Sequence, residues 1–415
     1  MKLKKLLVAS TLVALTSAMQ AATAAETTIK ALFMSQAAYS EDNVKSMTAA
    51  FEKSNPEIKV NLEFVPYDAL HSKIVAASGA GAQGYDVVLF DVIWPAEFAK
   101  RGFLLDVTER IPTDYSSQIF PGAWTTVEFA GKRYGMPWIL DTKYLFYNTA
   151  MLAKAGIDTP PTTWDELLVQ AKIIKDKGIV KYPLVWNWSQ SEGMICDYTT
   201  IMSAMGGEFF VDGKPAFNKG GAVKALNYMR GSLDSGLTNP SSREFSEEDV
   251  RRVFSNGEAA FALNWTYMNA LANDPKESKI AGKVGIVAAP GSKGISTASA
   301  VNGSMGLGIP SGSAHPDQAW AFISHLTKAS TQEKFAKLSL PIWKDSYSTA
   351  AVTEGQQSLV AAANNAIAVM YPRPLVQSYA EISDILQVRI HEVLLGQNDA
   401  QSALDAASKK VARIR

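Results

Sequence analysis

The chain has 415 residues, of which 47% are hydrophobic and 19% charged, a globular composition that excludes a disordered or fibrous protein. This length exceeds the roughly 250 to 300 residues at which one core usually divides, so we expect more than one domain. Forty Lys and Arg residues balance forty Asp and Glu residues, so no basic field indicates a nucleic-acid partner.

The first 25 residues have the pattern of a cleavable secretory signal peptide. A lysine-rich start precedes an apolar run at residues 6–15 and a small-x-small site at residues 22–24. The apolar run is shorter than the ~20 residues needed to span a bilayer. Cleavage would remove three lysines and leave a weakly acidic protein. No cysteine sits at the cleavage site, so the segment does not resemble a lipoprotein signal. Cys196 is the single cysteine, so we expect an exported periplasmic protein without an intrachain disulfide.

From residue 28 onward, short apolar strands alternate with longer amphipathic helices. The first half predicts strands at 29–34, 58–65 and 85–90, with helices at 40–56, 67–81 and 95–102. This order predicts the α/β class, with a mostly parallel sheet and helices on both faces. Ligands of such sheets lie outside the carboxyl ends of the strands, where Asp91 falls.

The remaining residues predict a second α/β lobe that is joined to the first by several crossings. Residues 138–144 are expected to cross between the lobes, the Gly- and Ser-rich segment 291–303 to be a loop or second crossing, and residues 340–343 to begin a third. The predicted organisation has a signal peptide at 1–25, an N-terminal lobe of 26–139 and 290–342, and a C-terminal lobe of 140–289 and 343–415. Two lobes joined in this way can hinge.

Several segments resemble the extracellular solute-binding proteins, the family that includes the maltodextrin-binding and other sugar-binding components of ABC importers. They include "GYDVVLFDVIWPAEFAKRGFLLDVT", "YGMPWILDTKYLFYNTAMLAKAGI", "FSNGEAAFALNWTY" and "YPRPLVQSYAEISDIL". The resemblance extends over essentially the whole chain after residue 25 and implies a two-lobed periplasmic-binding-protein fold. It also implies a sugar-like ligand, an inner-membrane permease as partner, and no cofactor. We expect a monomer.

A sugar site needs carboxylates and amides for the hydroxyl groups and aromatic faces for the C–H surface. Asp91 and Trp94 supply one of each after a strand, although Asp91 is equally suited to cap the following helix. The resemblance implies a polar ligand contact at Gln36, for which a surface amide is the alternative. It also implies a stacking ring at Trp265, for which core packing is the alternative.

Other candidates have two open interpretations each. Trp186 and Trp188 share one face of a predicted strand and either line the cleft or fill the core. Asp197 lies where the resemblance implies cleft residues, beside Cys196, which we interpret as a buried small apolar side chain.

The last candidates lie at the predicted crossings and in the C-terminal segment. Asp141 either holds the hinge or contacts ligand, Gly303 allows close backbone approach, and Trp343 is positioned to cap the cleft. Arg373 either pins the C-terminal segment or binds an anionic sugar derivative with its bidentate fork.

Nothing in the sequence marks a catalytic or metal site. The four histidines are scattered and show no metal-ligand spacing. The competing hypothesis is a periplasmic glycosidase that uses Asp91 with Asp141 or Asp197 as its carboxylate pair. We expect a non-catalytic receptor, because no acid belongs to an enzyme signature.

Overall fold

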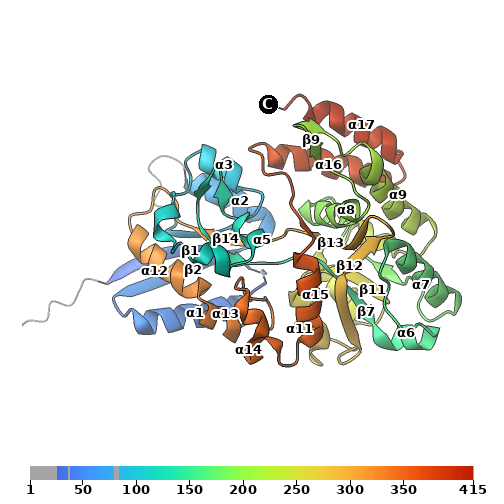
Figure 1. Cartoon of the computed structure of the whole chain (residues 1–415), viewed down its shortest axis with the longest axis horizontal. Helices are drawn as coiled ribbons and strands as arrows, with labels where there is room; N and C mark the ends of the chain where they lie inside the picture. Colours follow the sequence, from blue (N-terminus) through green and yellow to red (C-terminus); the bar gives the residue numbers. More distant parts are fainter. Residues whose placement is uncertain (1–25, 36–37, 79–83, 415) are drawn as a thin grey trace, which may run out of the picture.

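The computed structural model describes residues 26–35, 38–78 and 84–414, which form two lobes, each built on its own β-sheet (Figure 1). The predicted signal peptide and Gln36 lie outside the described residues. No helix in the described ranges is long and apolar enough to cross a bilayer.

The first lobe has a five-stranded sheet in the order β2-β1-β3-β14-β6. Strands β1 (Thr27–Met34), β2 (Ile58–Val65) and β3 (Val87–Asp91) are mutually parallel, as predicted. Strand β14 (Met305–Gly308) returns from the second lobe and pairs antiparallel with both β3 and β6 (Met136–Ile139). All five residues of β3 are buried, which explains its unbroken apolar run. The main helices of this lobe are α1 (Glu41–Ser54), α2 (Tyr67–Ala77), α3 (Pro95–Lys100), α12 (Pro316–Thr327) and α13 (Ala329–Lys334).

The second lobe has a six-stranded sheet in the order β15-β13-β12-β7-β11-β8. Three of its five pairings are antiparallel, so this sheet departs from the mostly parallel arrangement that we predicted. One cause is the β12–β13 hairpin, whose turn contains Gly294 in the left-handed region at φ 75°. The strands are β7 (Tyr144–Asn148), β8 (Leu184–Val185), β11 (Phe261–Asn264), β12 (Val284–Ser292), β13 (Ser296–Val301) and β15 (Met370–Tyr371).

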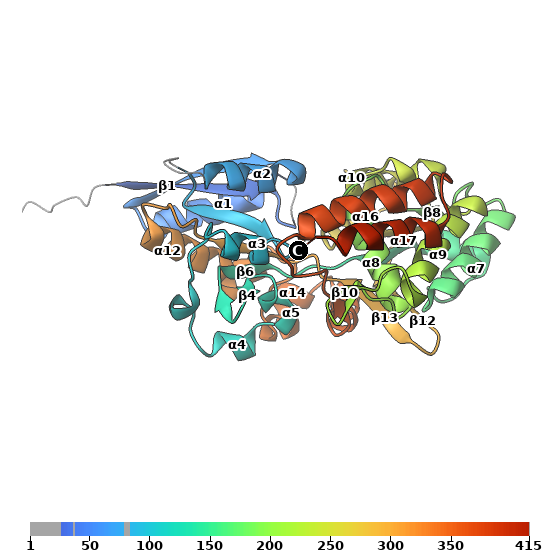
Figure 2. The same ribbon diagram turned by 90° about the horizontal axis from the view of Figure 1, so that it is seen from above.

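Helices cover both faces of the second sheet. Along β7, Leu145 belongs to one apolar cluster and its neighbours Tyr144 and Phe146 to another, as expected where successive side chains alternate between two buried faces. Figure 2 shows α16 and α17 side by side on the surface of this lobe. The first cluster includes residues of α7 (Trp164–Asp176), α8 (Glu192–Ala204), α9 (Gly220–Asp234), α16 (Tyr379–Leu394) and α17 (Ala400–Val411), and the second includes residues of α10 (Glu247–Ser255), α11 (Tyr267–Asn273), α14 (Ala350–Thr353) and α15 (Gln357–Ile367).

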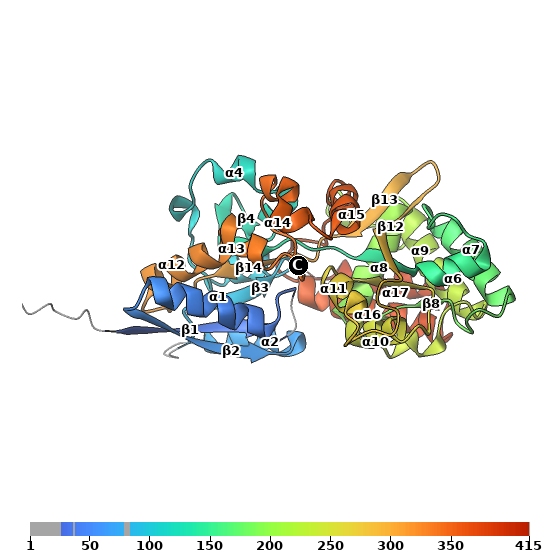
Figure 3. The same ribbon diagram turned by 90° about the horizontal axis from the view of Figure 1, so that it is seen from below.

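The chain crosses between the lobes three times. The first two crossings are residues 140–143, between β6 and β7, and residues 302–304, between β13 and β14. The return to the first lobe therefore differs from the predicted boundary at residue 290, because β12 and β13 continue the second sheet to Val301. The third crossing follows Trp343, which still packs in the first lobe's core, and Figure 3 shows α14 between α13 and α15.

Shorter elements complete the fold. They are η1 (Thr108–Arg110), α4 (Tyr115–Gln118), α5 (Pro121–Trp124), β4 (Glu128–Phe129), β5 (Lys132–Arg133), α6 (Thr149–Ala155), β9 (Phe210–Val211), β10 (Lys214–Pro215), η2 (Pro240–Arg243) and η3 (Asp345–Ser348).

A buried glutamine holds the start of the third crossing in place. Gln332 on α13 is fully buried and donates from Nε2 to the Trp138 carbonyl at 2.7 Å, while its Oε1 accepts from the Ile342 amide at 3.1 Å. One side chain thus satisfies two buried main-chain groups from β6 and from the segment before the crossing.

We expect Gln332→Leu to lower the free energy of unfolding by about 2 kcal/mol or more, because it leaves a buried carbonyl and a buried amide without partners. Gln357→Leu, at an exposed position on α15, is the control and should change stability by less than about 0.5 kcal/mol. Chemical denaturation measures both. Equal effects of the two substitutions would contradict the role given to Gln332.

Candidate functional site

A cleft of about 480 Å³ lies between the lobes and is lined by residues of both lobes and of the crossings. In the first sheet it lies at the carboxyl ends of β1, β3 and β6, where the strand-end rule predicted it. The lining residues that matter most are Ser35, Tyr67, Asp68 and Asp91 from the first lobe, Glu192, Cys196, Glu247, Glu248, Trp265, Tyr267 and Arg373 from the second, and Asp141 and Gly303 from the crossings.

Asp91 ends β3 and faces the cleft, with Tyr67 beside it. The Tyr67 hydroxyl, at the start of α2, donates to Asp91 Oδ2 at 3.1 Å. Trp94 lies behind Tyr67 and stacks on it, with ring centroids 5.9 Å apart and planes inclined by 24°. Trp94 is buried in the first lobe's core and does not line the cleft. The prediction that Trp94 contacts the ligand is therefore corrected. Trp94 packs against Tyr67, and Tyr67 lines the cleft with its aromatic ring.

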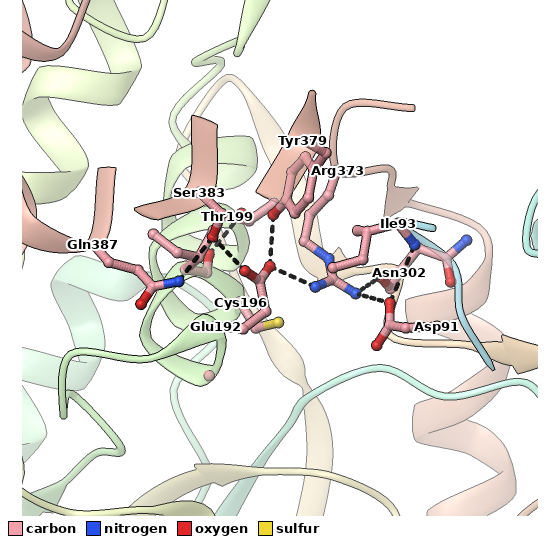
Figure 4. Close-up of polar contacts among 12 residues, drawn as sticks. Asp91, Ile93, Glu192, Cys196, Thr199, Asn302, Arg373, Tyr379, Ser383 and Gln387 are labelled. Carbon is pink, nitrogen blue, oxygen red and sulfur yellow. Dashed lines mark hydrogen bonds and ion pairs between the residues drawn. The ribbon is translucent and has the colours of Figure 1, made fainter. Parts of the chain in front are cut away.

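Arg373 connects the two lobes at the floor of the cleft (Figure 4). Its guanidinium group donates to Asp91 Oδ1 at 3.0 Å, to Glu192 Oε1 at 2.6 Å and to the Asn302 carbonyl at 3.2 Å. Asp91 belongs to the first lobe, Glu192 begins α8 of the second, and Asn302 lies on a crossing. The Arg373 side chain is only 1% exposed. Its charge is therefore engaged within the protein.

Glu192 is held from a second side as well. Its carboxylate accepts hydrogen bonds from the Tyr379 hydroxyl at 2.5 Å and from the Ser383 hydroxyl, both on α16. Figure 4 shows these groups converging on one carboxylate, beside the thiol of Cys196. Cys196 is buried as predicted, and it also lines the cleft.

Trp265 follows β11 and presents a half-buried ring to the cleft. Its indole Nε1 donates to Glu247 Oε1 at 3.4 Å, and the Lys143 ammonium lies 5.0 Å from the ring centroid. Gly303 lies directly against the ring, since a Cβ atom added there would be 2.2 Å from Trp265 Cζ3. Gly303 thus lines the cleft as predicted, and its contact with Trp265 is one reason why a larger residue does not fit.

Lys143 and Asp197 form a fully buried ion pair near Trp265. Their Nζ and Oδ1 atoms are 2.5 Å apart, and Lys143 also donates to Asn187 Oδ1 at 2.8 Å and to the Gly193 carbonyl at 3.2 Å. Burial raises the pKa of Asp197 to about 7, against the opposing attraction of Lys143. Asp197 does not line the cleft, so the structure places it among groups that position α8 and the Trp265 environment.

Asp141 occupies the first crossing, where it both holds the hinge and lines the cleft. Its Oδ1 accepts from the Thr266 hydroxyl at 2.6 Å and the Thr142 amide at 2.8 Å, and its carbonyl accepts from the Gly303 amide at 3.1 Å. Burial raises the pKa of the Asp141 carboxyl to about 7. Its Oδ2 has no hydrogen-bond partner among the described residues.

Three further tryptophans proposed for the site lie in the core. Trp186 and Trp188 are fully buried in the second lobe and stack on each other at 5.5 Å, with Trp186 Nε1 donating to the Thr238 hydroxyl at 3.0 Å. Trp343 packs in the first lobe and donates to the Thr327 carbonyl at 2.8 Å. None of the three lines the cleft, because each ring is covered by neighbouring helices or loops of its own lobe.

Sequence reasoning missed several residues that line or support the cleft. Tyr67 follows the end of β2, so the strand-end rule could have found it. Glu192, Glu247 and Lys143 carried no comparable signal, because an acid in the first turn of a helix is ordinary and the hydrogen-bond partners of Lys143 are 44 to 54 residues away in the chain.

The cleft offers hydrogen-bond acceptors and aromatic rings from both sides, which suits a small polyhydroxylated solute. No group of metal-binding side chains occurs in the described ranges. Two lobes, three crossings and a cleft between them that is lined by carboxyl groups and aromatic rings define a two-lobed binding protein for a small molecule.

Comparisons with known proteins agree with this class. Residues 37–333 match the family described as bacterial extracellular solute-binding protein. A probable ABC transporter-binding protein of Deinococcus radiodurans is 31% identical over 353 residues, 81% of each chain.

Solved structures of similar shape include the maltose-bound MalE3 of T. maritima, with a TM-score of 0.84, 30% identity and coverage of 94% of this chain and 100% of that one. A solute-binding protein of Thermotoga lettingae bound with α-D-tagatose has a TM-score of 0.83 and 27% identity, and covers 94% and 99% of the two chains. The chain belongs to the bacterial extracellular solute-binding protein family, which confirms the predicted family and two-lobed α/β fold.

We expect Gly303→Ala to displace the Trp265 ring toward solvent, because the new methyl group would occupy the ring's position. Acrylamide quenching of tryptophan fluorescence should then increase. The increase should disappear when Gly303→Ala is combined with Trp265→Phe. Gly312→Ala, where an added Cβ meets nothing within 4 Å, is the control and should leave quenching unchanged.

The raised pKa of Asp141 predicts a pH dependence of stability. The folded carboxyl keeps its proton to about pH 7, whereas the unfolded one loses it near pH 4. Between these values the folded state binds more protons, so this group lowers the free energy of unfolding as pH rises, by at most about 1.4 kcal/mol per unit.

Asp141→Asn should remove this contribution, so the difference in unfolding free energy between the two proteins should change across pH 4–7. Asp158→Asn, an exposed position, should show no such change. Denaturant titrations at several pH values measure it, and parallel curves for native protein and Asp141→Asn would contradict the assignment.

Proposed function

We propose that this protein captures a neutral sugar or polyol in the cleft between its lobes and delivers it to the permease of an ABC importer. One observation carries the proposal. Asp91 and Tyr67 of the first lobe line the same cleft as Trp265 and Glu247 of the second lobe. Carboxylate oxygens accept hydrogen bonds from sugar hydroxyls, and aromatic rings cover the C–H faces of the ring or chain. The solved relatives with maltose and tagatose support the same class of solute.

We expect the solute to be captured when the two lobes close about the crossings. A solute that contacts both lobes binds the closed arrangement better than the open one, and it shifts the population by that difference in affinity alone. The closed arrangement is the form that the permease recognises. The protein acts as a monomer in the periplasm after removal of residues 1–25.

An anionic sugar derivative held by Arg373 is the alternative ligand. The engagement of Arg373 with Asp91 and Glu192 argues against it, because an incoming anion would have to displace a carboxylate that is already paired. The neutral solute is therefore favoured.

A glycosidase is the remaining alternative, and two of its three candidate acids are already engaged in ion pairs. Asp91 is paired with Arg373, and Asp197 is paired with Lys143 away from the cleft surface. We propose a non-catalytic receptor. Incubation with a bound sugar, followed by chromatography, should return the sugar unchanged, and appearance of hydrolysis products would overturn this point.

The experiment that tests the function is a thermal-shift screen of residues 26–415 against neutral sugars, polyols and their charged derivatives. A solute at about 100 times its Kd should add roughly 2.7 kcal/mol of stability. A rise in Tm with a neutral sugar or polyol is the expected result. A response to none of these compounds would contradict the proposed class of solute.

Trp265→Ala should weaken binding of the sugar found in this screen by at least about tenfold, since it removes a ring that faces the cleft. Trp343→Phe is the matched control, because Trp343 lies in the core of the first lobe. It should lower Tm without changing affinity. Calorimetric titration measures both, and unchanged affinity in Trp265→Ala would contradict the site.

A further inference from the structure

The cleft has a strong excess of negative charge. The acids that line it are Asp68, Asp91, Asp141, Glu192, Glu247 and Glu248, whereas Arg373 is the single basic residue among the described lining residues. Acidic side chains alone do not identify a ligand. Whether the cleft can bind an anionic solute depends on whether the nearby cations are already paired with these acids.

The nearby cations are already engaged. Arg373 is paired with Asp91 and Glu192, Lys143 is 2.5 Å from Asp197 and 3.7 Å from Glu247, and Arg251 is 2.9 Å from Glu248. Seven carboxyl groups in and beneath the cleft are thus set against three cations, and among the described residues that line or underlie the cleft no cation is left for an anionic solute.

Asp141 is the lining acid at which we expect the excess negative charge of the cleft to act on a solute. Its side chain is buried, with the whole residue 5% exposed, and it lines the cleft. Oδ1 is occupied by Thr266 and Thr142, whereas Oδ2 has no partner within the described ranges, and Asp141 forms no ion pair there. Oδ2 is not among the buried side-chain atoms and lies in a residue that lines the cleft, so it can accept a hydrogen bond from a solute that brings a donor.

We infer that the solute carries no anionic group, and that a protonated amine set against Asp141 binds more tightly than a hydroxyl at the same position. The inference rests on the proposed function and narrows its class of solute to neutral and amino-substituted sugars or polyols. An ammonium group donates a charge-assisted hydrogen bond to Oδ2, which is stronger than the neutral bond from a hydroxyl. A carboxylate or phosphate would be desolvated beside the Asp141 carboxylate without gaining a cation as partner among the described lining residues, which disfavours its binding.

The test compares probes that differ at one carbon only. Sorbitol, 1-amino-1-deoxysorbitol and gluconate form one set, and glucose, 6-amino-6-deoxyglucose and glucuronate form another. If the screen described above selects a different skeleton, the amino and carboxylate derivatives of that skeleton take their place. Calorimetric titrations are run at pH 8, above the pKa of about 7 of the Asp141 carboxyl.

The amine should bind at least about fivefold more tightly than the hydroxyl compound, and the carboxylate at least about tenfold more weakly. In Asp141→Asn the amine-to-hydroxyl ratio should fall to near one. The amide oxygen can still accept from Thr266, while the amide nitrogen replaces Oδ2 as a donor. Asp158→Asn makes the same charge change at an exposed site and should leave the ratio intact.

The outcomes separate this inference from the proposed function. Equal affinities within a set, or tightest binding of the carboxylate, overturn the inference and leave a sugar receptor. An amine preference that survives in Asp141→Asn overturns the role of Asp141. Failure of every neutral, amino and anionic compound to bind overturns the proposed function, and this inference with it.

Discussion

The arrangement of the cleft depends on the ion pairs that the buried guanidinium group of Arg373 forms with Asp91 and Glu192. It joins the end of β3 in the first lobe, the first residue of α8 in the second and the main chain of a crossing. A paired charge in this position is costly to create, and removal of one partner is costlier still, because the others remain buried without compensation. Arg373 therefore fixes the relative positions of Asp91 and Glu192.

On the other side of the cleft, a second buried cation is likewise paired with groups of the protein. Lys143 lies under Trp265 and is shared by Asp197, Glu247 and the main chain of Gly193. Both buried cations thus organise protein groups, and the cleft surface consists mainly of acceptors and rings. This division follows from desolvation, since a cation fully surrounded by protein needs its partners within the protein.

Much of the fold was predictable from local pattern, whereas only part of the site was. The apolar run of β3 and its terminal Asp91 identified a strand end at the cleft, and Trp265 and Gly303 were correctly placed beside it. Trp94 was wrongly expected to contact ligand, and the choice between cleft and core stayed open for Trp186 and Trp188, because a large ring near a strand end has the same sequence signature whether it fills the core or faces solvent. Glu192 was missed for a different reason. Its importance comes from Arg373, 181 residues further along the chain, and no local pattern encodes such a pairing.

The position of β14 has a consequence for how the protein is made. This strand lies between β3 and β6 in the middle of the first sheet, yet it comes from residues 305–308. Until those residues are available, β3 and β6 have no strand between them and the sheet cannot form as a unit. The amino-terminal lobe therefore completes its core only after most of the chain, including the sheet strands β7 to β13 of the other lobe, has been synthesised. Assembly from such distant segments is slow compared with local folding, and the chain stays longer in an incompletely folded form.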